Sequence, residues 1–480
     1  MPFRTPAPFL PSVVRNILSI GVGDIAGKLI TLGAFIYIAR LLSPAVFGDL
    51  NFAMAIAGLF VPLVDFGLGF VGTRAVARDH ATLLPTAAHI ILLRTALAVI
   101  AFALLVLVLF AFGVPDRPFH LALIFGLVLF LQALSLSWAY QGTAHTSWFA
   151  VEKLTQAVLY AGLVLLFFTG DTDVFSLPLF TFLSTFVAVV IILFGYLVPN
   201  VTGPMVIGIG HFVRRHWAAI FPLFLTTLIT QFHLVIDIVI VWYLLSSEQA
   251  GEFSAGFRLV ITLLILPNLL WSSFFPILSR SSGNEGFWRN NAGILMSLVW
   301  WSAFFTAGVA IVYAEDLFGL VYGDKYEHVS WIFRWLLMAL ALSFPSLALT
   351  RILPTRGFDR HLYRISAIAI VTHIAVSSVL TWQYGIMGAA MGFLVSEAVM
   401  LTFGFAVTGR LLGRTMFRRF AAALTAGTAA FGFGSVMQVV GGLSWEFGIF
   451  VTTLIYGCWF MVTERRILAD LREYEKGQEG

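Results

Sequence analysis

The sequence contains a single cysteine and few charged residues. Cys458 has no second cysteine to pair with, which excludes an internal disulfide and a metal cluster held by several cysteines. Asp, Glu, Lys and Arg make up only 11% of the 480 residues, whereas soluble domains contain about a quarter. A phosphate-binding glycine loop is also missing, which excludes ATP as the direct energy source. The low charged fraction lies far outside the range of soluble domains.

Hydrophobic residues are abundant instead, at 60% of the chain, and the mean hydropathy is +0.95. A membrane span needs about 20 mostly apolar residues, and runs of that length predict about fourteen transmembrane helices. The sequence therefore predicts an all-α polytopic membrane protein. The predicted spans cover residues 16–39, 48–72, 88–112, 119–142, 147–169, 174–198, 217–244, 250–278, 291–314, 328–350, 365–384, 386–409, 420–439 and 443–463.

The basic residues predict the orientation of these spans. Most of the 28 Lys and Arg residues fall in connections on one side of the predicted membrane, and only Arg40, Arg117 and Lys325 fall on the other. Cytoplasmic loops carry such an excess of Lys and Arg. We therefore expect both termini to be cytoplasmic.

A short pattern recurs in the second half of the chain. Residues 41–49 (LLSPAVFGD) are similar to residues 244–252 (LLSSEQAGE), 203 positions later. Six predicted spans separate the copies, so both halves would share one orientation, as in transporters with parallel repeats. Chance similarity among apolar segments is the alternative. We predict an N-terminal lobe, an interlobe linker, a C-terminal lobe, two additional spans and a cytoplasmic tail, over 1–198, 199–216, 217–409, 410–463 and 464–480.

Several stretches carry the pattern of a known family. Residues 37–44 read YIARLLSP and are followed by Phe47-Gly48. Residues 65–69 read DFGLG and precede RAVAR at 74–78, and residues 138–142 read WAYQG at the end of the fourth span. These stretches resemble the polysaccharide flippases, of the O-antigen type (Wzx-like), in the multidrug/oligosaccharidyl-lipid/polysaccharide exporter superfamily. The resemblance covers residues 1–165 well and the C-terminal half mainly through span count and spacing.

This resemblance implies two six-helix lobes around a central cavity that opens alternately to each side. It implies an undecaprenyl-diphosphate-linked oligosaccharide as cargo, no enzymatic activity and a place in the bacterial inner membrane. Expected partners are the lipid-linked glycan, membrane lipids and other polysaccharide assembly proteins, with no nucleic acid and no cofactor.

Five cations fall inside predicted spans. A charge at the bilayer centre costs about 2.5–3.5 kcal/mol on insertion scales, so each must face protein, face a wet cavity or snorkel. Lys28 would lie near mid-bilayer, Arg94 and Lys153 within two turns of the cytoplasmic end, and Arg258 and Arg334 near the external end.

A diphosphate needs positive charge at every stage of its crossing, because an unpaired anion in a low dielectric is very costly. We therefore predict that Lys28, Arg94, Arg258 and Arg334 bind the diphosphate. We further predict that Lys28, Arg258 and Arg334 line one cavity. The alternative is that each cation pairs with a local carboxylate and locks two helices together.

Asp24 lies one turn before Lys28, so these two side chains can form such a pair. Gly23 and Gly27 are spaced to let a second helix approach closely. The sequence leaves structural and ion-coupling roles for Asp24 open. Asp65 is expected to cap a helix or to pair near Arg74.

Two other acids lie deep in predicted spans. Asp237 is one turn from His233, and Glu397 stands alone. Desolvation disfavours the charged form of a carboxylate, so both acids are candidates for coupling transport to protons; sodium is the alternative ion. One His and one Asp are too few ligands for a metal site, and we expect none.

Two other functions were weighed. A membrane glycosyltransferase, polymerase or ligase would need catalytic acids or an Arg/His site, usually in a substantial external loop. The external loops predicted here are at most about 15 residues long. A multidrug exporter of the same superfamily would be expected to have a cavity richer in acids than in cations. The prominent intramembrane cations favour an anionic cargo.

Overall fold

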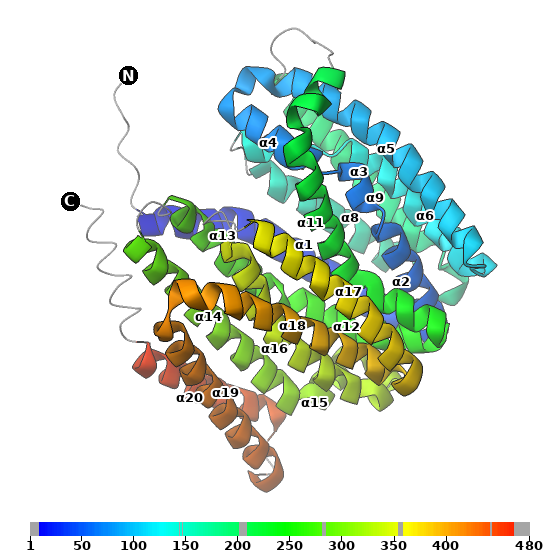
Figure 1. Cartoon of the computed structure of the whole chain (residues 1–480). Coiled ribbons are helices and arrows are strands. Elements are labelled where there is room, and N and C mark those ends of the chain that lie inside the picture. Colours follow the sequence, from blue (N-terminus) through cyan, green and yellow to red (C-terminus); the bar gives the residue numbers. More distant parts are fainter. Residues whose placement is uncertain are drawn as a thin grey trace. The chain divides into compact units, whose positions relative to one another are not determined.

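The computed structural model describes residues 9–143, 145, 147–200, 209–280, 285–353, 359–441 and 444–464. Every regular element in these ranges is a helix, as Figure 1 shows. A helix satisfies its own backbone hydrogen bonds, which an apolar bilayer requires of any spanning segment. The predicted all-α membrane fold is confirmed.

The helices before the predicted interlobe linker are α1 Phe9–Leu41, α2 Pro44–Gly58, α3 Val61–Asp65, α4 Leu68–Arg78, α5 Leu83–Ala111, α6 Asp116–Ala133, α7 Ser137–Gly142, α8 Ser147–Phe167, α9 Ser176–Ile192 and α10 Val198–Asn200. Those after it are α11 Ile209–Leu244, α12 Ser247–Leu263, α13 Ile265–Arg280, α14 Glu285–Val312, α15 Ala314–Tyr322, α16 Ser330–Ile352, α17 Asp359–Tyr384, α18 Ile386–Leu412, α19 Arg414–Gly441 and α20 Trp445–Thr463.

Within the described residues, 13 helical segments are long and apolar enough to cross a membrane. Each overlaps one of the predicted spans from the second to the fourteenth. The first predicted span, 16–39, lies inside the continuous 33-residue helix α1. The lobe boundaries proposed from the sequence stay a prediction.

Three predicted spans contain breaks that hydropathy alone did not reveal. The span 250–278 is divided at Leu264, between α12 and α13. The span 48–72 is divided into α2, α3 and α4, and the span 119–142 is divided into α6 and α7. The chain turns between α3 and α4 through Phe66 and Gly67, with φ angles of 46° and 76°. Left-handed backbone is unusual for a bulky residue such as Phe66. The spanning part of the second helix therefore ends at Asp65.

Contacts divide the chain into two compact units. Unit 1 comprises Met1–Gly21, Gly256–Val376 and Ala390–Gly480, and unit 2 comprises Val22–Ala255 and Ser377–Ala389. In unit 1, Trp300 of α14 packs against Phe405 of α18 and Phe420 of α19. In unit 2, Trp138 and Tyr140 belong to a buried cluster that α4, α5, α7 and the end of α9 build.

Candidate functional site

Lys28 and Asp24 form an ion pair on α1 with a 2.7 Å separation. The predicted contact is confirmed. The side chain of Lys28 is 44% exposed and that of Asp24 is 28% exposed. Because an ion pair facing lipid would be costly, we interpret this exposed face of α1 as one that meets water.

Gly23 and Gly27 bring α1 against α8, as their spacing predicts. A Cβ on Gly23 would lie 2.7 Å from the Cα of Ala150, and one on Gly27 would lie 3.4 Å from the Lys153 carbonyl oxygen. The two matched contacts run in the same direction along both helices. Lys28 therefore lies level with Lys153, although the sequence placed the two lysines at different depths.

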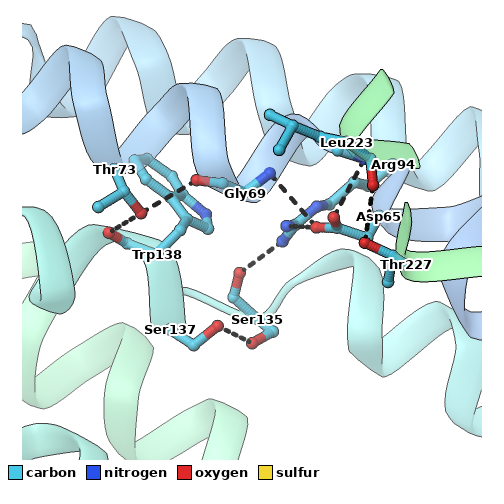
Figure 2. Close-up of polar contacts among 10 residues, drawn as sticks. Asp65, Gly69, Thr73, Arg94, Ser135, Ser137, Trp138, Leu223 and Thr227 are labelled. Atoms are coloured by element: carbon cyan, nitrogen blue, oxygen red, sulfur yellow. Dashed lines mark hydrogen bonds and ion pairs between the residues drawn. The ribbon is translucent and has the colours of Figure 1, made fainter. Parts of the chain in front are cut away.

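Arg94 is buried in unit 2, where it holds two broken helices together. Its Nη2 forms an ion pair with Asp65, and its Nη1 donates to the Ser135 carbonyl at 3.0 Å (Figure 2). Asp65 also accepts the backbone N–H groups of Gly67 and Gly69 at 3.1 and 3.3 Å. The predicted capping role of Asp65 is confirmed, but its ion partner is Arg94, which lies 29 residues away, and not Arg74.

The same junction joins α4 to α7. The Thr73 hydroxyl donates to the Trp138 carbonyl at 3.0 Å (Figure 2). A Cβ on Gly142 would lie 2.8 Å from the Thr73 carbonyl oxygen, so the helices meet backbone to backbone. A partial signal for this junction was present in the sequence, because Trp138 and Gly142 belong to the stretch that resembles the flippase family.

Arg334 and Arg258 both lie near α15 in unit 1. Arg334 of α16 pairs with Glu315 of α15 at 2.6 Å, and both side chains are exposed. Burial raises the pKa of the Tyr322 hydroxyl, and the charge of Arg258 opposes that shift. The short helix α15 thus lies against both predicted substrate-binding arginines of this unit.

The two deep carboxylates each contact a serine hydroxyl. The Ser377 hydroxyl donates to Asp237 at 2.5 Å within unit 2, and both residues are fully buried. The Ser346 hydroxyl bonds to Glu397 within unit 1, where Glu397 is 4% exposed. Both acids are therefore removed from bulk water, as their positions in the sequence predicted.

The sequence did not predict the contacts of Asp49. This buried carboxylate accepts from Arg117 Nε at 2.7 Å, Trp242 Nε1 at 2.8 Å and the Ser247 hydroxyl at 2.6 Å. Its partners lie 68, 193 and 198 residues away. The only available signal was the glycine–acid pair, Gly48-Asp49, at the end of the recurring pattern.

The predicted site residues divide between the two units. Unit 2 holds Lys28, Asp24, Arg94 and Asp237, and unit 1 holds Arg258, Arg334 and Glu397. A common cavity for Lys28, Arg258 and Arg334 therefore stays a prediction. Among the described residues, no group of three or more His, Cys, Asp or Glu side chains could hold a metal ion.

The family model of the polysaccharide biosynthesis proteins matches residues 13–282, more than half of the chain. This chain belongs to the polysaccharide biosynthesis protein family. The resemblance seen in the N-terminal sequence is confirmed. A search of curated proteins found no significant match.

Solved structures with a similar fold include transporters and a flippase. The lipid II flippase MurJ, in an inward closed conformation, matches with a TM-score of 0.72 at 12% identity, over 94% of this chain and 99% of that chain. A multidrug resistance MATE family transporter, facing inward, matches with a TM-score of 0.64 at 14% identity, over 80% and 95%. A MOP superfamily transporter from Pyrococcus furiosus, described as having a binding pocket of reverse polarity, matches with a TM-score of 0.58 at 15% identity, over 86% and 100%.

These identities are low, so the structural matches concern the fold. This member of the polysaccharide biosynthesis protein family is thus an integral membrane protein with the fold shared by MurJ and the MATE transporters. In this chain, the broken helices carry the Asp65–Arg94 pair, and α1 carries the exposed Asp24–Lys28 pair.

Proposed function

We propose that this protein is a flippase that moves an undecaprenyl-diphosphate-linked oligosaccharide from the cytoplasmic to the periplasmic leaflet of the bacterial inner membrane. It works by alternating access, without catalysing a reaction, and serves the synthesis of lipopolysaccharide or exopolysaccharide. Both termini face the cytoplasm, and other polysaccharide assembly proteins act before and after it.

The observation that carries this proposal is the half-exposed Lys28–Asp24 pair within a long apolar helix of a polysaccharide biosynthesis family member. A lipid anchor can stay among acyl chains while its diphosphate crosses, so the protein must supply charge along the way for the head group alone. An ammonium in a wet groove provides that charge, because phosphate oxygens accept charge-assisted hydrogen bonds.

The contacts of Asp49 join the two predicted halves, which alternating access would separate. Asp49 and Arg117 belong to the first predicted half, whereas Trp242 and Ser247 belong to the second. When the halves separate, Asp49 loses two neutral donors but keeps the guanidinium. The carboxylate therefore stays neutralised in both states, which limits the cost of opening.

Asp237 and Glu397 are the proposed coupling groups. Each is buried against a serine hydroxyl that can donate to a carboxylate or accept from a carboxylic acid. Uptake and release of a proton therefore need no change of hydrogen-bond partner. Transport that depends on a sodium gradient and not on a pH gradient would identify sodium as the coupling ion instead.

The test of the flippase function uses vesicles containing the purified chain and a fluorescent polyprenyl-diphosphate disaccharide. An impermeant reductant bleaches only outer-leaflet label, so a flippase lowers the protected fraction. We expect this loss of protection with the wild-type chain but not with a variant carrying Lys28→Ala, Arg258→Ala and Arg334→Ala.

Expression and melting of the triple variant must match the wild type, because a folding defect would also abolish movement. Unchanged protection with the folded wild-type chain would contradict the proposal. Export of a cationic dye by the same vesicles, without movement of the glycolipid, would indicate a multidrug exporter instead.

A further inference from the structure

Lys153 is a second intramembrane lysine on the same surface region as Lys28. Gly27 precedes Lys28 directly, and a Cβ on Gly27 would lie 3.7 Å from the Cβ of Lys153. One turn earlier, Gly23 touches Ala150 in the same way. Because Gly23 and Gly27 have no side chains, α8 approaches α1 closely and places Lys153 beside Lys28. All of these residues lie in unit 2.

The two lysines also lie at the same depth. Lys28 is followed by 13 residues to the end of α1 at Leu41, and Lys153 by 14 residues to the end of α8 at Phe167. At 1.5 Å per residue, each lysine is about 20 Å from the far end of its helix. Lys153 also follows the start of α8 at Ser147 by six residues, or about 9 Å. In a hydrocarbon core about 30 Å thick, both ammonium groups therefore belong to the third predicted to adjoin the cytoplasm.

Both ammonium groups have N–H donors that are available to a bound anion. The side chain of Lys153 is 36% exposed, and its Nζ is 3.3 Å from Glu152. The same Nζ lies 5.7 Å from the centroid of the Phe149 ring. An ammonium has three N–H donors, and among the described residues each lysine donates to one carboxylate, Asp24 or Glu152.

The two carboxylates explain how the lysines are tolerated without a ligand. Glu152 is buried and accepts a hydrogen bond from the Tyr140 hydroxyl, which fixes the carboxylate independently of Lys153. Lys153 can therefore turn toward an incoming anion while Glu152 keeps a donor. Asp24 neutralises Lys28 across one helical turn.

We propose that Lys28 and Lys153 together form a diphosphate clamp in the cytoplasmic third of the membrane, each ammonium donating to oxygens of one diphosphate group. This inference rests on the proposed function, and it adds Lys153 as a binding residue. The ligand chemistry is a diphosphate, either lipid-linked or free.

Binding to the purified full-length chain tests the clamp. The probes are farnesyl diphosphate, farnesyl monophosphate and inorganic pyrophosphate. The variants are Lys28→Ala, Lys153→Ala and their combination. Arg289→Ala is the matched control, because Arg289 forms an exposed ion pair with Glu285 at the same four-residue spacing.

We expect each lysine variant to bind farnesyl diphosphate about tenfold more weakly or worse, since each removes a charge-assisted contact. The affinity of the double variant should fall by a smaller factor than the product of the factors measured for the two single variants, because both lysines bind the same ligand. Lys153→Arg should keep part of the affinity, and Arg289→Ala should bind as the wild type does. Tighter binding of farnesyl diphosphate than of pyrophosphate identifies a lipid-linked head group, and equal binding identifies the diphosphate alone.

Normal binding by Lys153→Ala would overturn the clamp and leave the flippase proposal standing. A wild-type chain that binds none of the diphosphates would overturn both. Thiol protection gives a second measurement in a Cys458→Ser background, should an alanine variant fold poorly. Farnesyl diphosphate, at a concentration that saturates each cysteine variant in the binding measurement, should slow alkylation of K28C and K153C but not of R289C. Equal rates with and without ligand at saturation would refute the clamp.

Discussion

Gly48 of α2 and Gly251 of α12 face each other through bare backbone. A Cβ on Gly48 would lie 2.8 Å from the Gly251 nitrogen, and one on Gly251 would lie 3.1 Å from the Gly48 nitrogen. The Cβ added to Gly48 would also overlap the carbonyl oxygen of Ser247, and the Cβ added to Gly251 would overlap the carbonyl oxygen of Pro44. All four residues belong to unit 2.

This contact is reciprocal in the numbering of the recurring pattern. Gly48 corresponds to Gly251 and Pro44 to Ser247 at the offset of 203 residues. Gly48 of the first copy meets Ser247 of the second, and Pro44 of the first copy meets Gly251 of the second. A local two-fold relation between the copies produces such a reciprocal pair of contacts. The two copies of the pattern therefore meet each other, which supports an internal repeat on grounds independent of sequence similarity.

Alanine at Gly48 should destabilise the protein. The added methyl group would overlap the backbone of α12, and overpacking of this kind costs about 1–3 kcal/mol. Thermal unfolding in detergent measures the loss. Gly162→Ala in α8 is the control, because its Cβ would meet no atom within 4 Å. Equal melting temperatures for Gly48→Ala and Gly162→Ala would contradict the close contact.

Removal of Arg117 alone should be more harmful than removal of both charges of its pair with Asp49. Arg117→Ala leaves the Asp49 carboxylate, which is 3% exposed, without its counterion, and breaking a buried pair costs about 3–5 kcal/mol. The double variant Asp49→Asn/Arg117→Ala removes both charges and keeps an amide oxygen that can accept from Trp242 and Ser247. Chemical denaturation should therefore rank Arg117→Ala as the less stable of the two variants. The reverse order would show that the two neutral donors are sufficient for the Asp49 charge.

The Asp65–Arg94 pair predicts a similar asymmetry. Asp65→Ala leaves a guanidinium buried without its counterion, and breaking a buried pair costs about 3–5 kcal/mol. The double variant Asp65→Ala/Arg94→Met should recover part of that stability, because no unpaired charge remains. A double variant that is folded and still flips the glycolipid would assign Arg94 a structural role. Folded protein without binding of farnesyl diphosphate would support the substrate-binding role predicted from the sequence.

Loss of either deep carboxylate should uncouple transport from the driving ion. Glu397→Gln and Asp237→Asn keep a hydrogen-bonding partner for their serines but cannot bind a proton reversibly. Glycolipid movement should then lose its dependence on an imposed pH gradient. A sodium gradient applied at constant pH is the parallel measurement. Unchanged pH and sodium dependence in both variants would exclude these acids as coupling groups.

Topology can be tested with reporter fusions. A fusion at Gly480, which lies outside the described residues, should report a cytoplasmic location. A fusion within α15 should report a periplasmic one, because this helix belongs to the external loop of the predicted orientation. A periplasmic result at Gly480 with a cytoplasmic result in α15 would show that the predicted orientation, and the direction of transport inferred from it, are reversed.

Sequence alone predicted what depends on local composition. Long apolar runs predicted the spans, and the spacing of Gly23 and Gly27 predicted a helix contact, since both signals lie within one helix. The contacts of Asp49 and the Arg94 partner of Asp65 were missed, because both join distant parts of the chain. The break at Phe66 was also missed, because the stretch around it is apolar on average despite Asp65, and hydropathy does not register a change of φ.

The depth of Lys28 and Lys153 sets a distance that the cargo must still travel. If the two lysines hold a diphosphate about 20 Å from the far end of α1 and α8, two thirds of the hydrocarbon thickness lies ahead of it. A lysine side chain reaches only a few ångströms, so no swing of these ammonium groups can deliver the anion to the other leaflet. Once bound, the head group depends for the longer part of its passage on rearranged helices or on cations elsewhere in the chain.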